Sequence, residues 1–198
     1  SLGFAVRKGL VEALDTAESN VNVRAIILIG EGATFPAGAD IREFGHAPQE
    51  PHLPAICDKI EMTKKPVISA LHGTALGGGL EIALSSHYRI ASEKTKIGLP
   101  EVHLGLLPGA GGTQRLPRLA GVIPALKIMT SGNPISSTEA LKIGIIDKIA
   151  DDLLVNAKSF ARENMGKNNY PITSNIQGKI VDSEENRGAI KSFREELQ

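Results

Sequence analysis

Two glutamates in apolar surroundings are the residues of this sequence best suited to moving protons. Glu81 follows three glycines in "TALGGGLEIALSSH" (residues 74–87), and Glu101 follows a proline in "GLPEVHLGLLPG". An unpaired buried carboxylate is costly unless its pKa rises or it finds partners. A helix dipole near Glu81 would ease that cost, which is a purely structural explanation for one such acid. Two of them indicate a general acid/base pair able to move protons on an enolate.

The glycines before Glu81 suit either catalysis or tight packing. At a helix start, the first backbone N–H groups are unpaired and carry partial positive charge. Without side chains, Gly77–Gly79 would let a substrate oxygen reach these donors, forming an oxyanion hole worth about 2.7–4 kcal/mol per donor. Close packing of helix on strand explains the same glycines equally well. The segment "FPAGADI" (35–41) also leaves backbone N–H groups accessible, although Asp40 alone is more typical of a helix cap.

Other candidate sites are weaker. "LGGGLE" lacks the lysine and serine or threonine of a P-loop, and "GAGGTQR" matches GxGxxG only loosely, which disfavours a nucleotide site. Arg115 and Arg118 could hold phosphate, but a solvated helix face is favoured for both. The histidines are scattered, and each is more typical of a core or surface position than of catalysis: His46, His52, His72, His87 and His103.

The elements expected around Glu81 alternate between strand and helix. Runs of β-branched and apolar residues predict buried strands at 23–30, 66–73 and 87–92. Glu81 lies between the last two, in a segment expected to form a loop and then a helix. This order is typical of βα crossover units and indicates an α/β fold.

Helical patterns occupy much of the remaining sequence. Apolar spacing predicts a helix over 3–18, and "ICDKIEMTKK" (56–65) predicts another that Pro66 would end. The proline-rich segment 45–55 is expected to be an irregular connection. After about residue 112 the pattern is mainly helical. In "ISSTEALKIG", Ser136 or Ser137 could cap a helix that ends at Gly144, and a last charged helix is expected over 183–197.

Composition describes an ordinary globular chain. The 198 residues suit one domain with a sizeable core, and 22 basic residues balance 22 acidic ones, so no net field favours nucleic acid or an anionic membrane. No apolar run approaches the length of about 18 residues that spans a bilayer. Cys57 is the only cysteine and cannot form an internal disulfide. Metal-ligand spacings such as CxxC and HExxH do not occur, so no metal is expected.

Longer segments resemble the enoyl-CoA hydratase/isomerase (crotonase) family. They are "FPAGADI", "KPVISALHGTALGGGLEIAL", "GLPEVHLGLLPGAGGTQRLPRLAG" and "SGNPISSTEALKIGIIDKI", and they lie within residues 3–160. Within the family, "LEIALSSHYRIAS" and "NPISSTEALKIGIIDKI" most resemble the N-terminal hydratase half of peroxisomal bifunctional enzymes. The resemblance implies an α/β crotonase-like ββα superhelix with a helical C-terminal region. It divides the chain into a catalytic core, residues 1–165, without the family's N-terminal strands, and a linker with a last helix, residues 166–198.

The resemblance also implies a role for each matching residue. The N–H groups of Ala39 and Gly78 would form an oxyanion hole for the thioester carbonyl of a coenzyme A substrate. Glu81 would deprotonate water for attack at the β-carbon, and Glu101 would deliver a proton to the α-carbon. Further substrate-binding positions would be Ala37, Gly38, Asp40 and Ile41.

The implied activity is reversible hydration of trans-2-enoyl-CoA to 3-hydroxyacyl-CoA in fatty acid β-oxidation, with no cofactor beyond the coenzyme A of the substrate. An enoyl-CoA isomerase relying on Glu101, and a non-catalytic acyl-CoA-binding or RNA-binding relative, are the alternatives; the neutral charge disfavours RNA. Neither nucleic acid nor membrane is an expected partner. Self-association and fusion to a 3-hydroxyacyl-CoA dehydrogenase half are both compatible with the resemblance. The expected location is the peroxisome by resemblance, and otherwise the mitochondrial matrix or cytoplasm.

Overall fold

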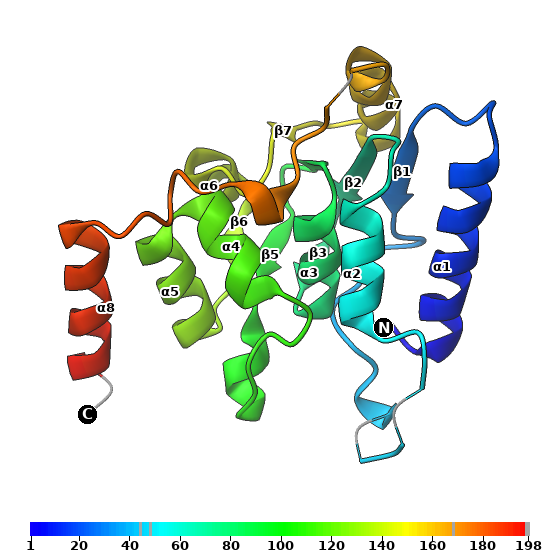
Figure 1. Ribbon diagram of the computed structural model, residues 1–198. Helices are drawn as coiled ribbons and strands as arrows, with labels where there is room; N and C mark the ends of the chain where they lie inside the picture. The colour runs from blue at the N-terminus through cyan, green and yellow to red at the C-terminus, as the bar shows by residue number, and fades with distance from the viewer. Residues whose placement is uncertain (44, 48, 168, 197–198) are drawn as a thin grey trace.

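Two sheets and the helices packed on them form the computed structural model, which describes residues 1–43, 45–47, 49–167 and 169–196 (Figure 1). In these residues a four-stranded parallel sheet has the order β1-β2-β4-β7, and a three-stranded sheet has the order β3-β5-β6. In the smaller sheet β3 pairs parallel to β5, and β6 pairs antiparallel to β5. The strands are β1 (Ile26–Ile29), β2 (Val67–Leu71), β3 (Thr74–Leu76), β4 (Tyr88–Ala91), β5 (Lys96–Gly98), β6 (Ile135–Ser136) and β7 (Lys148–Ile149).

Helices connect these strands and cover them. The α-helices are α1 (Phe4–Ser19), α2 (Leu53–Glu61), α3 (Gly78–Ser85), α4 (Gly112–Ala120), α5 (Val122–Ser131), α6 (Ser137–Ile143), α7 (Leu153–Asn164) and α8 (Glu184–Glu196). Short 3-10 helices are η1 (Ile41–Glu43), η2 (Pro100–Leu104) and η3 (Thr173–Asn175). The order β2-β3-α3 places one strand in each sheet before a helix, which is the ββα unit expected of a crotonase-like superhelix. The order β4-β5-η2-α4 repeats it, so the predicted fold class is confirmed.

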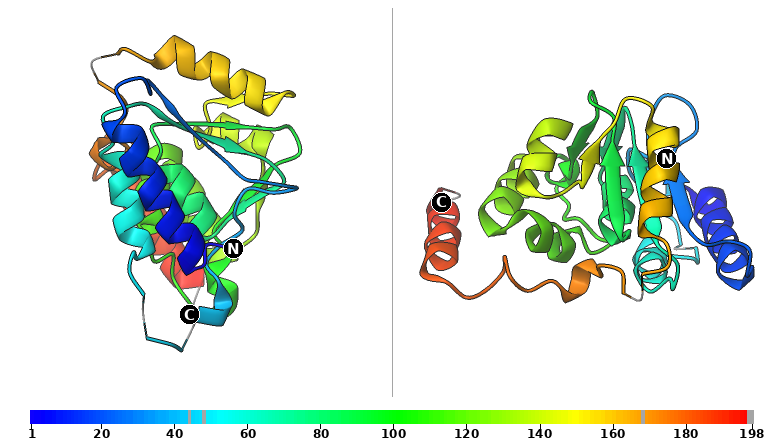
Figure 2. Two further views of the ribbon diagram at one scale, coloured as in Figure 1. Left: turned by 90° about the vertical axis from the view of Figure 1, so that its right-hand side faces the viewer. Right: turned by 90° about the horizontal axis from the view of Figure 1, so that it is seen from above.

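The strand β2 shows why its sequence is apolar on both faces. Val67 and Leu71 belong to the main core, whereas Ile68 and Ala70 pack with helix α7 on the other face of the sheet. Side chains alternate across a strand, so a strand covered on both faces is apolar throughout. Figure 2 shows α7 lying across one side of the sheet, away from α3.

Helix α3 carries Glu81 into the middle of the molecule. All of its residues are buried, and it packs against α2 and α4, as Figure 1 shows. An apolar helix surface on every side is typical of a central helix. Glu81 is the single acid on this helix, so its carboxylate needs partners from neighbouring elements.

The C-terminal segment lies apart from this core. Helix α8 packs against α5 at the edge of the molecule opposite α1 (Figures 1 and 2), and none of its described residues is buried. The helix expected over 183–197 is therefore confirmed over Glu184–Glu196, while residue 197 lies outside the described residues. The division of the chain between residues 165 and 166 stays a prediction.

Most of the expected elements are present, and the exceptions lie beside the glycine-rich and proline-rich segments. The three expected strands are present as β1, β2 and β4, and Ser136 caps α6 by accepting a hydrogen bond from the Glu139 N–H, while Gly144 ends the helix in a left-handed conformation. The loop expected before α3 was wrong, because residues 74–76 form β3. The helix expected over 56–65 instead spans 53–61, beginning inside the segment expected to be irregular.

Candidate active site

A cavity of about 1220 Å³ opens beside the N-terminus of α3. Its walls come from the segment 37–43, the loop before α2, the start of α3, and the segment 100–110. The structure brings the sequence-predicted residues together here: Ala37, Gly38, Ala39, Asp40, Gly78, Glu81 and Glu101 all line the cavity. Ile41 begins η1, and its side chain lies outside the described part of the structure.

Glu81 is held by one oxygen of its carboxylate. Its Oε1 accepts hydrogen bonds from the N–H groups of Ala110 (2.7 Å) and Gly112 (2.8 Å), at the start of helix α4. The side chain is buried, and burial raises its pKa, although these two N–H groups and the Arg115 charge oppose the shift. No hydrogen bond among the described residues involves its Oε2. The arrangement fixes one oxygen and leaves the other available on the cavity side.

Glu101 has a different environment. It lies in η2, and its Oε2 is buried with no hydrogen-bond partner among the described residues. Burial raises its pKa, and the nearby negative charge of Glu81 raises it further. An unpaired buried oxygen and a raised pKa make the protonated form of a carboxyl group easier to populate, and that form can donate a proton.

Backbone positions beside these acids explain the three glycines separately. Gly77 has φ +52, and a Cβ there would lie 3.0 Å from Glu101 Oε1. A Cβ on Gly78 would lie 3.6 Å from the Ala39 nitrogen, so these two expected donors are neighbours. A Cβ on Gly79 would lie 1.8 Å from the Pro36 carbonyl oxygen. Gly79 therefore permits close packing, whereas Gly78 borders the cavity, and its role in an oxyanion hole stays a prediction.

The two expected oxyanion donors have free N–H groups within the described residues. Gly78 is the first residue of α3, so its N–H has no acceptor within the helix. Ala39 pairs with Leu2 in an isolated parallel bridge through the Leu2 N–H, which donates to the Gly38 carbonyl at 2.9 Å. None of the described residues accepts a hydrogen bond from the Ala39 N–H. Two adjacent N–H groups at a cavity wall suit a carbonyl oxygen that gains negative charge.

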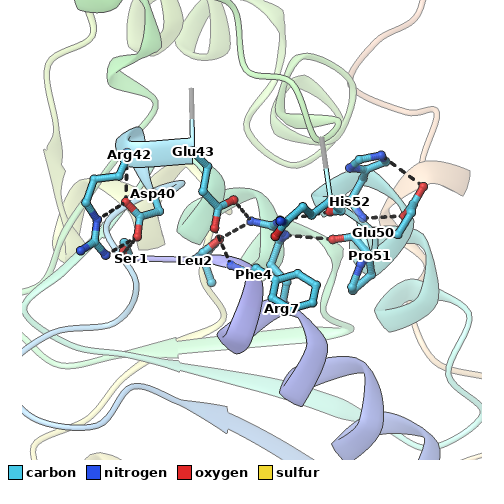
Figure 3. Close-up of polar contacts among 11 residues, drawn as sticks. Ser1, Leu2, Phe4, Arg7, Asp40, Arg42, Glu43, Glu50, Pro51 and His52 are labelled. Atoms are coloured by element: carbon cyan, nitrogen blue, oxygen red, sulfur yellow. Dashed lines mark hydrogen bonds and ion pairs between the residues drawn. The ribbon is translucent and has the colours of Figure 1, made fainter. Parts of the chain in front are cut away.

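Arg7 fastens the cavity rim to helix α1, as Figure 3 shows. Its buried guanidinium donates to the Leu2 carbonyl (2.9 Å), the Pro51 carbonyl (2.9 Å), the Gln49 carbonyl (3.2 Å) and Glu43 Oε2 (2.6 Å). The same guanidinium therefore holds the rim and the residue that pairs with Ala39. Sequence reasoning missed Arg7 because its partners lie about forty residues away.

Asp40 and Arg42 form the outer part of the same rim (Figure 3). Arg42 donates through Nε (2.9 Å) and Nη2 (2.6 Å) to the Asp40 carboxylate, and this pairing holds the pKa of Asp40 well below its usual range. Asp40 Oδ1 also accepts the Arg42 backbone N–H at the start of η1, as a helix-capping aspartate would.

The expectation of a solvated helix face was wrong for Arg115, whereas Arg118 is half-buried. Arg115 is buried and forms an ion pair with Glu61 at 2.9 Å, and Arg118 donates to the Ile176 carbonyl at 2.8 Å. Among the histidines, His87 is a buried core residue that accepts the Val67 N–H, as expected. His46 and His52 line the cavity mouth instead.

Among the described residues, no group of three or more His, Cys, Asp or Glu could hold a metal ion. Cys57 is buried, and burial raises the pKa of its thiol to about 12. Of the helices in the described ranges, none is long and apolar enough to cross a bilayer.

This chain is similar in sequence to known proteins. A family described as "Enoyl-CoA hydratase/isomerase" matches residues 1–191. The chain is 46% identical over 168 residues to a peroxisomal bifunctional enzyme of Danio rerio, covering 84% of this chain and 23% of that protein. It is 42% identical over 187 residues to a probable enoyl-CoA hydratase of Bacillus subtilis (strain 168), covering 89% of this chain and 72% of that protein.

Solved structures show the same fold. The crystal structure of an enoyl-CoA hydratase from Bacillus anthracis matches with a TM-score of 0.75 and 33% identity, covering 96% of this chain and 79% of that one. The resemblance to peroxisomal bifunctional enzymes expected from the sequence is confirmed. This chain spans about a quarter of the length of the Danio rerio relative.

Proposed function

This chain belongs to the enoyl-CoA hydratase/isomerase family, and we propose that it catalyses reversible hydration of trans-2-enoyl-CoA to 3-hydroxyacyl-CoA. The observation that carries the proposal is the meeting of two carboxylates, Glu81 and Glu101, with the N–H groups of Ala39 and Gly78 around one cavity. Acid, base and oxyanion donors on one surface are the parts that addition of water to an enoyl thioester needs.

In the proposed reaction, the thioester carbonyl oxygen accepts hydrogen bonds from Ala39 and Gly78. Glu81 takes a proton from water through the carboxylate oxygen that the backbone leaves free, and the water oxygen forms a bond to the β-carbon. The carbon–carbon double bond becomes single as negative charge moves to the thioester oxygen. Glu101 then gives its proton to the α-carbon, so the elements of one water molecule are added.

The environments of the two acids support these separate roles. Glu81 is oriented by two N–H groups and lies near the Arg115 charge, which favours its ionised form. Burial raises the pKa of both acids; at Glu101, whose Oε2 has no hydrogen-bond partner among the described residues, the negative charge of Glu81 adds to that rise, whereas the Arg115 charge opposes it at Glu81. Two carboxyl groups whose environments separate their pKa values are suited to serve as base and acid.

Isomerisation of 3-enoyl-CoA is a second candidate activity. The unpaired oxygen of Glu101 beside the expected oxyanion hole supports it, because moving a double bond needs only one group that shuttles a proton between carbons. Under this alternative, Glu81→Gln would reduce isomerisation much less than Glu101→Gln.

The experiment that tests the proposal compares both single variants in hydration and in binding. If Glu81→Gln and Glu101→Gln bind a saturated acyl-CoA like the wild type but lose turnover, the two acids have a chemical role. If both variants keep wild-type turnover, the proposed mechanism is wrong. Binding without any turnover in the wild type would identify an acyl-CoA-binding protein.

The acyl-CoA thioester is the proposed ligand, and no cofactor beyond its coenzyme A part is proposed. Full turnover after exhaustive dialysis with a chelator would support that statement, and loss restored by a metal ion would contradict it.

For a partner, relatives named bifunctional and multifunctional enzymes support a 3-hydroxyacyl-CoA dehydrogenase half in preference to self-association alone. Relatives described as peroxisomal support a peroxisomal location in preference to the mitochondrial matrix or cytoplasm, and imaging of the tagged protein in cells tests it.

A further inference from the structure

We propose that Arg115 is a positioning residue for Glu81: its guanidinium holds the turn at residues 110–112 in the geometry that orients the Glu81 carboxylate. The inference rests on the proposed hydratase function for the meaning of that orientation. Arg115 does not touch the cavity, so it acts through the turn.

The guanidinium lies directly against the turn. Arg115 Nη1 donates to the Ala110 carbonyl at 3.0 Å, while the Ala110 N–H and the Gly112 N–H donate to Glu81 Oε1. Between them, Gly111 has φ +94, and a Cβ there would lie 2.3 Å from Arg115 Nη1. The turn is therefore fixed by Arg115 on one side and presents two donors to Glu81 on the other.

Helix α2 and η3 hold the guanidinium in place. Arg115 Nη2 donates to Glu61 Oε2 and to Asp58 Oδ1, both at 2.9 Å, and Nε donates to Glu61 Oε2 at 3.3 Å. The second oxygen of Glu61 accepts the Ser174 N–H at 2.8 Å. Arg115 thus has little freedom to move, and neither has the turn that it holds.

Stability alone is a poor reason for this buried pair. Taking two charges out of water costs about as much as their attraction returns, and apolar replacements of both partners are often neutral or stabilising. An arginine fork can instead fix a carbonyl and a carboxylate in one plane. Precise placement of the Glu81 carboxylate is what such a fork contributes here.

The charge of Arg115 also acts on Glu81. The titratable groups facing Glu81 are Arg115 from α4, Glu101 from η2 and the Cys57 thiol from α2. Arg115 lowers the pKa of Glu81, and the two N–H groups of the turn lower it as well. Loss of Arg115 removes the first contribution and weakens the second, so the pKa of Glu81 should rise.

The test combines variants that separate placement from folding. Arg115→Met leaves Glu61 buried without its partner and is expected to destabilise the chain. Arg115→Met with Glu61→Gln removes both charges, and the carbonyl oxygen of the new amide side chain can still accept the Ser174 N–H. Arg118→Met is the matched control, because Arg118 lies on the same helix and donates to Ile176 instead of the turn.

For each variant, kcat and KM for crotonyl-CoA are measured over pH, together with the thermal unfolding midpoint. For the double variant we expect a wild-type-like midpoint, a KM within about threefold, and a kcat lower by about 10- to 100-fold, since a misplacement of about 1 Å can cost that much. The acidic limb of its pH profile should move to higher pH, and Arg118→Met should match the wild type.

Recovery of both the midpoint and kcat in the double variant would show that Arg115 only supports folding and would overturn the inference. Carbon-13 NMR titration of the glutamate carboxyl groups, with Glu81→Gln for assignment, gives a readout without turnover. An unchanged Glu81 pKa in the double variant would also contradict the inference. A wild type that lacks hydratase turnover would count against the proposed function, and the NMR titration would then decide for Arg115.

Discussion

Substitution of the adjacent Gly78 and Gly79 by alanine should reduce activity for different reasons, the first by blocking the site and the second by destabilising the fold. A Cβ on Gly78 would meet Leu53 Cδ2 at 2.6 Å, which is the far end of a flexible side chain, and would lie 3.6 Å from the Ala39 nitrogen. A Cβ on Gly79 would lie 1.8 Å from the Pro36 carbonyl oxygen and 2.6 Å from its carbon, which are backbone atoms.

The magnitudes follow from these neighbours. In Gly78→Ala, moving Leu53 off its rotamer costs about 0.5–1.5 kcal/mol, and the gain in helix propensity offsets up to about 1 kcal/mol of that. The unfolding midpoint should therefore change by only about 2–4 °C. The new methyl group would lie 3.6 Å from the Ala39 nitrogen and should crowd the oxygen that these donors are proposed to bind, so kcat should fall by about 100- to 1000-fold, as for the loss of an oxyanion donor.

In Gly79→Ala the backbone must move, so the chain should lose about 1–3 kcal/mol of stability or more, and loss of activity should follow unfolding. The assay is decay of the conjugated enoyl-thioester absorbance of crotonyl-CoA, beside thermal unfolding of each variant. A Gly78→Ala variant that is folded and fully active would refute the assignment of its N–H to the oxyanion hole.

Three further predictions concern the rim, the acyl pocket and the buried acid. Arg7→Met should lower the free energy of unfolding by about 1–3 kcal/mol, because it leaves the acceptors of the guanidinium unpaired, and it should raise KM. The control Lys8→Met, at an exposed position of the same helix, should match the wild type in chemical unfolding and in kinetics. Leu107 lines the cavity and is 80% exposed, so an acyl chain could cover it, and kcat/KM should rise with acyl length by up to about fourfold per buried methylene. Leu107→Ser should weaken that rise, whereas Val102→Ser, outside the cavity lining, should not. An unchanged dependence on acyl length in Leu107→Ser would contradict this prediction. Burial raises the pKa of Glu81, so its contribution to the free energy of unfolding is fully present below the unfolded pKa and is lost as pH rises through the folded pKa. The thermal unfolding midpoint of Glu81→Gln should therefore rise relative to that of the wild type as pH increases. A midpoint difference that does not change with pH would contradict this prediction.

Local sequence was sufficient for part of the framework around the candidate acids. Strands β1 and β2 have runs of mainly apolar residues, and the residues capping α6 follow known preferences, so these features were predictable. Strands β3 and β5 have three residues each, which is too short for a pattern of alternation, and β3 continues directly into the glycines of α3. Their pairing is a consequence of the tertiary fold.

The candidate site was predictable where its residues are small or acidic in apolar segments. Glu81, Glu101 and the glycines between the strands have unusual surroundings in the sequence itself. Arg7 and Arg115 have no such signal, because a charged residue on an amphipathic helix ordinarily faces solvent. Most of their partners are distant in the sequence and become visible only in three dimensions; Glu61, the buried partner of Arg115, lies 54 residues away.

The most direct test of the account is hydration of crotonyl-CoA by the wild type and by Glu101→Gln, with binding of a saturated acyl-CoA measured for both. The account predicts wild-type turnover, a loss of about 100-fold or more in the variant, as for a missing general acid, and nearly equal binding. Equal turnover in the two proteins, or no turnover in a wild type that binds the thioester, would contradict it.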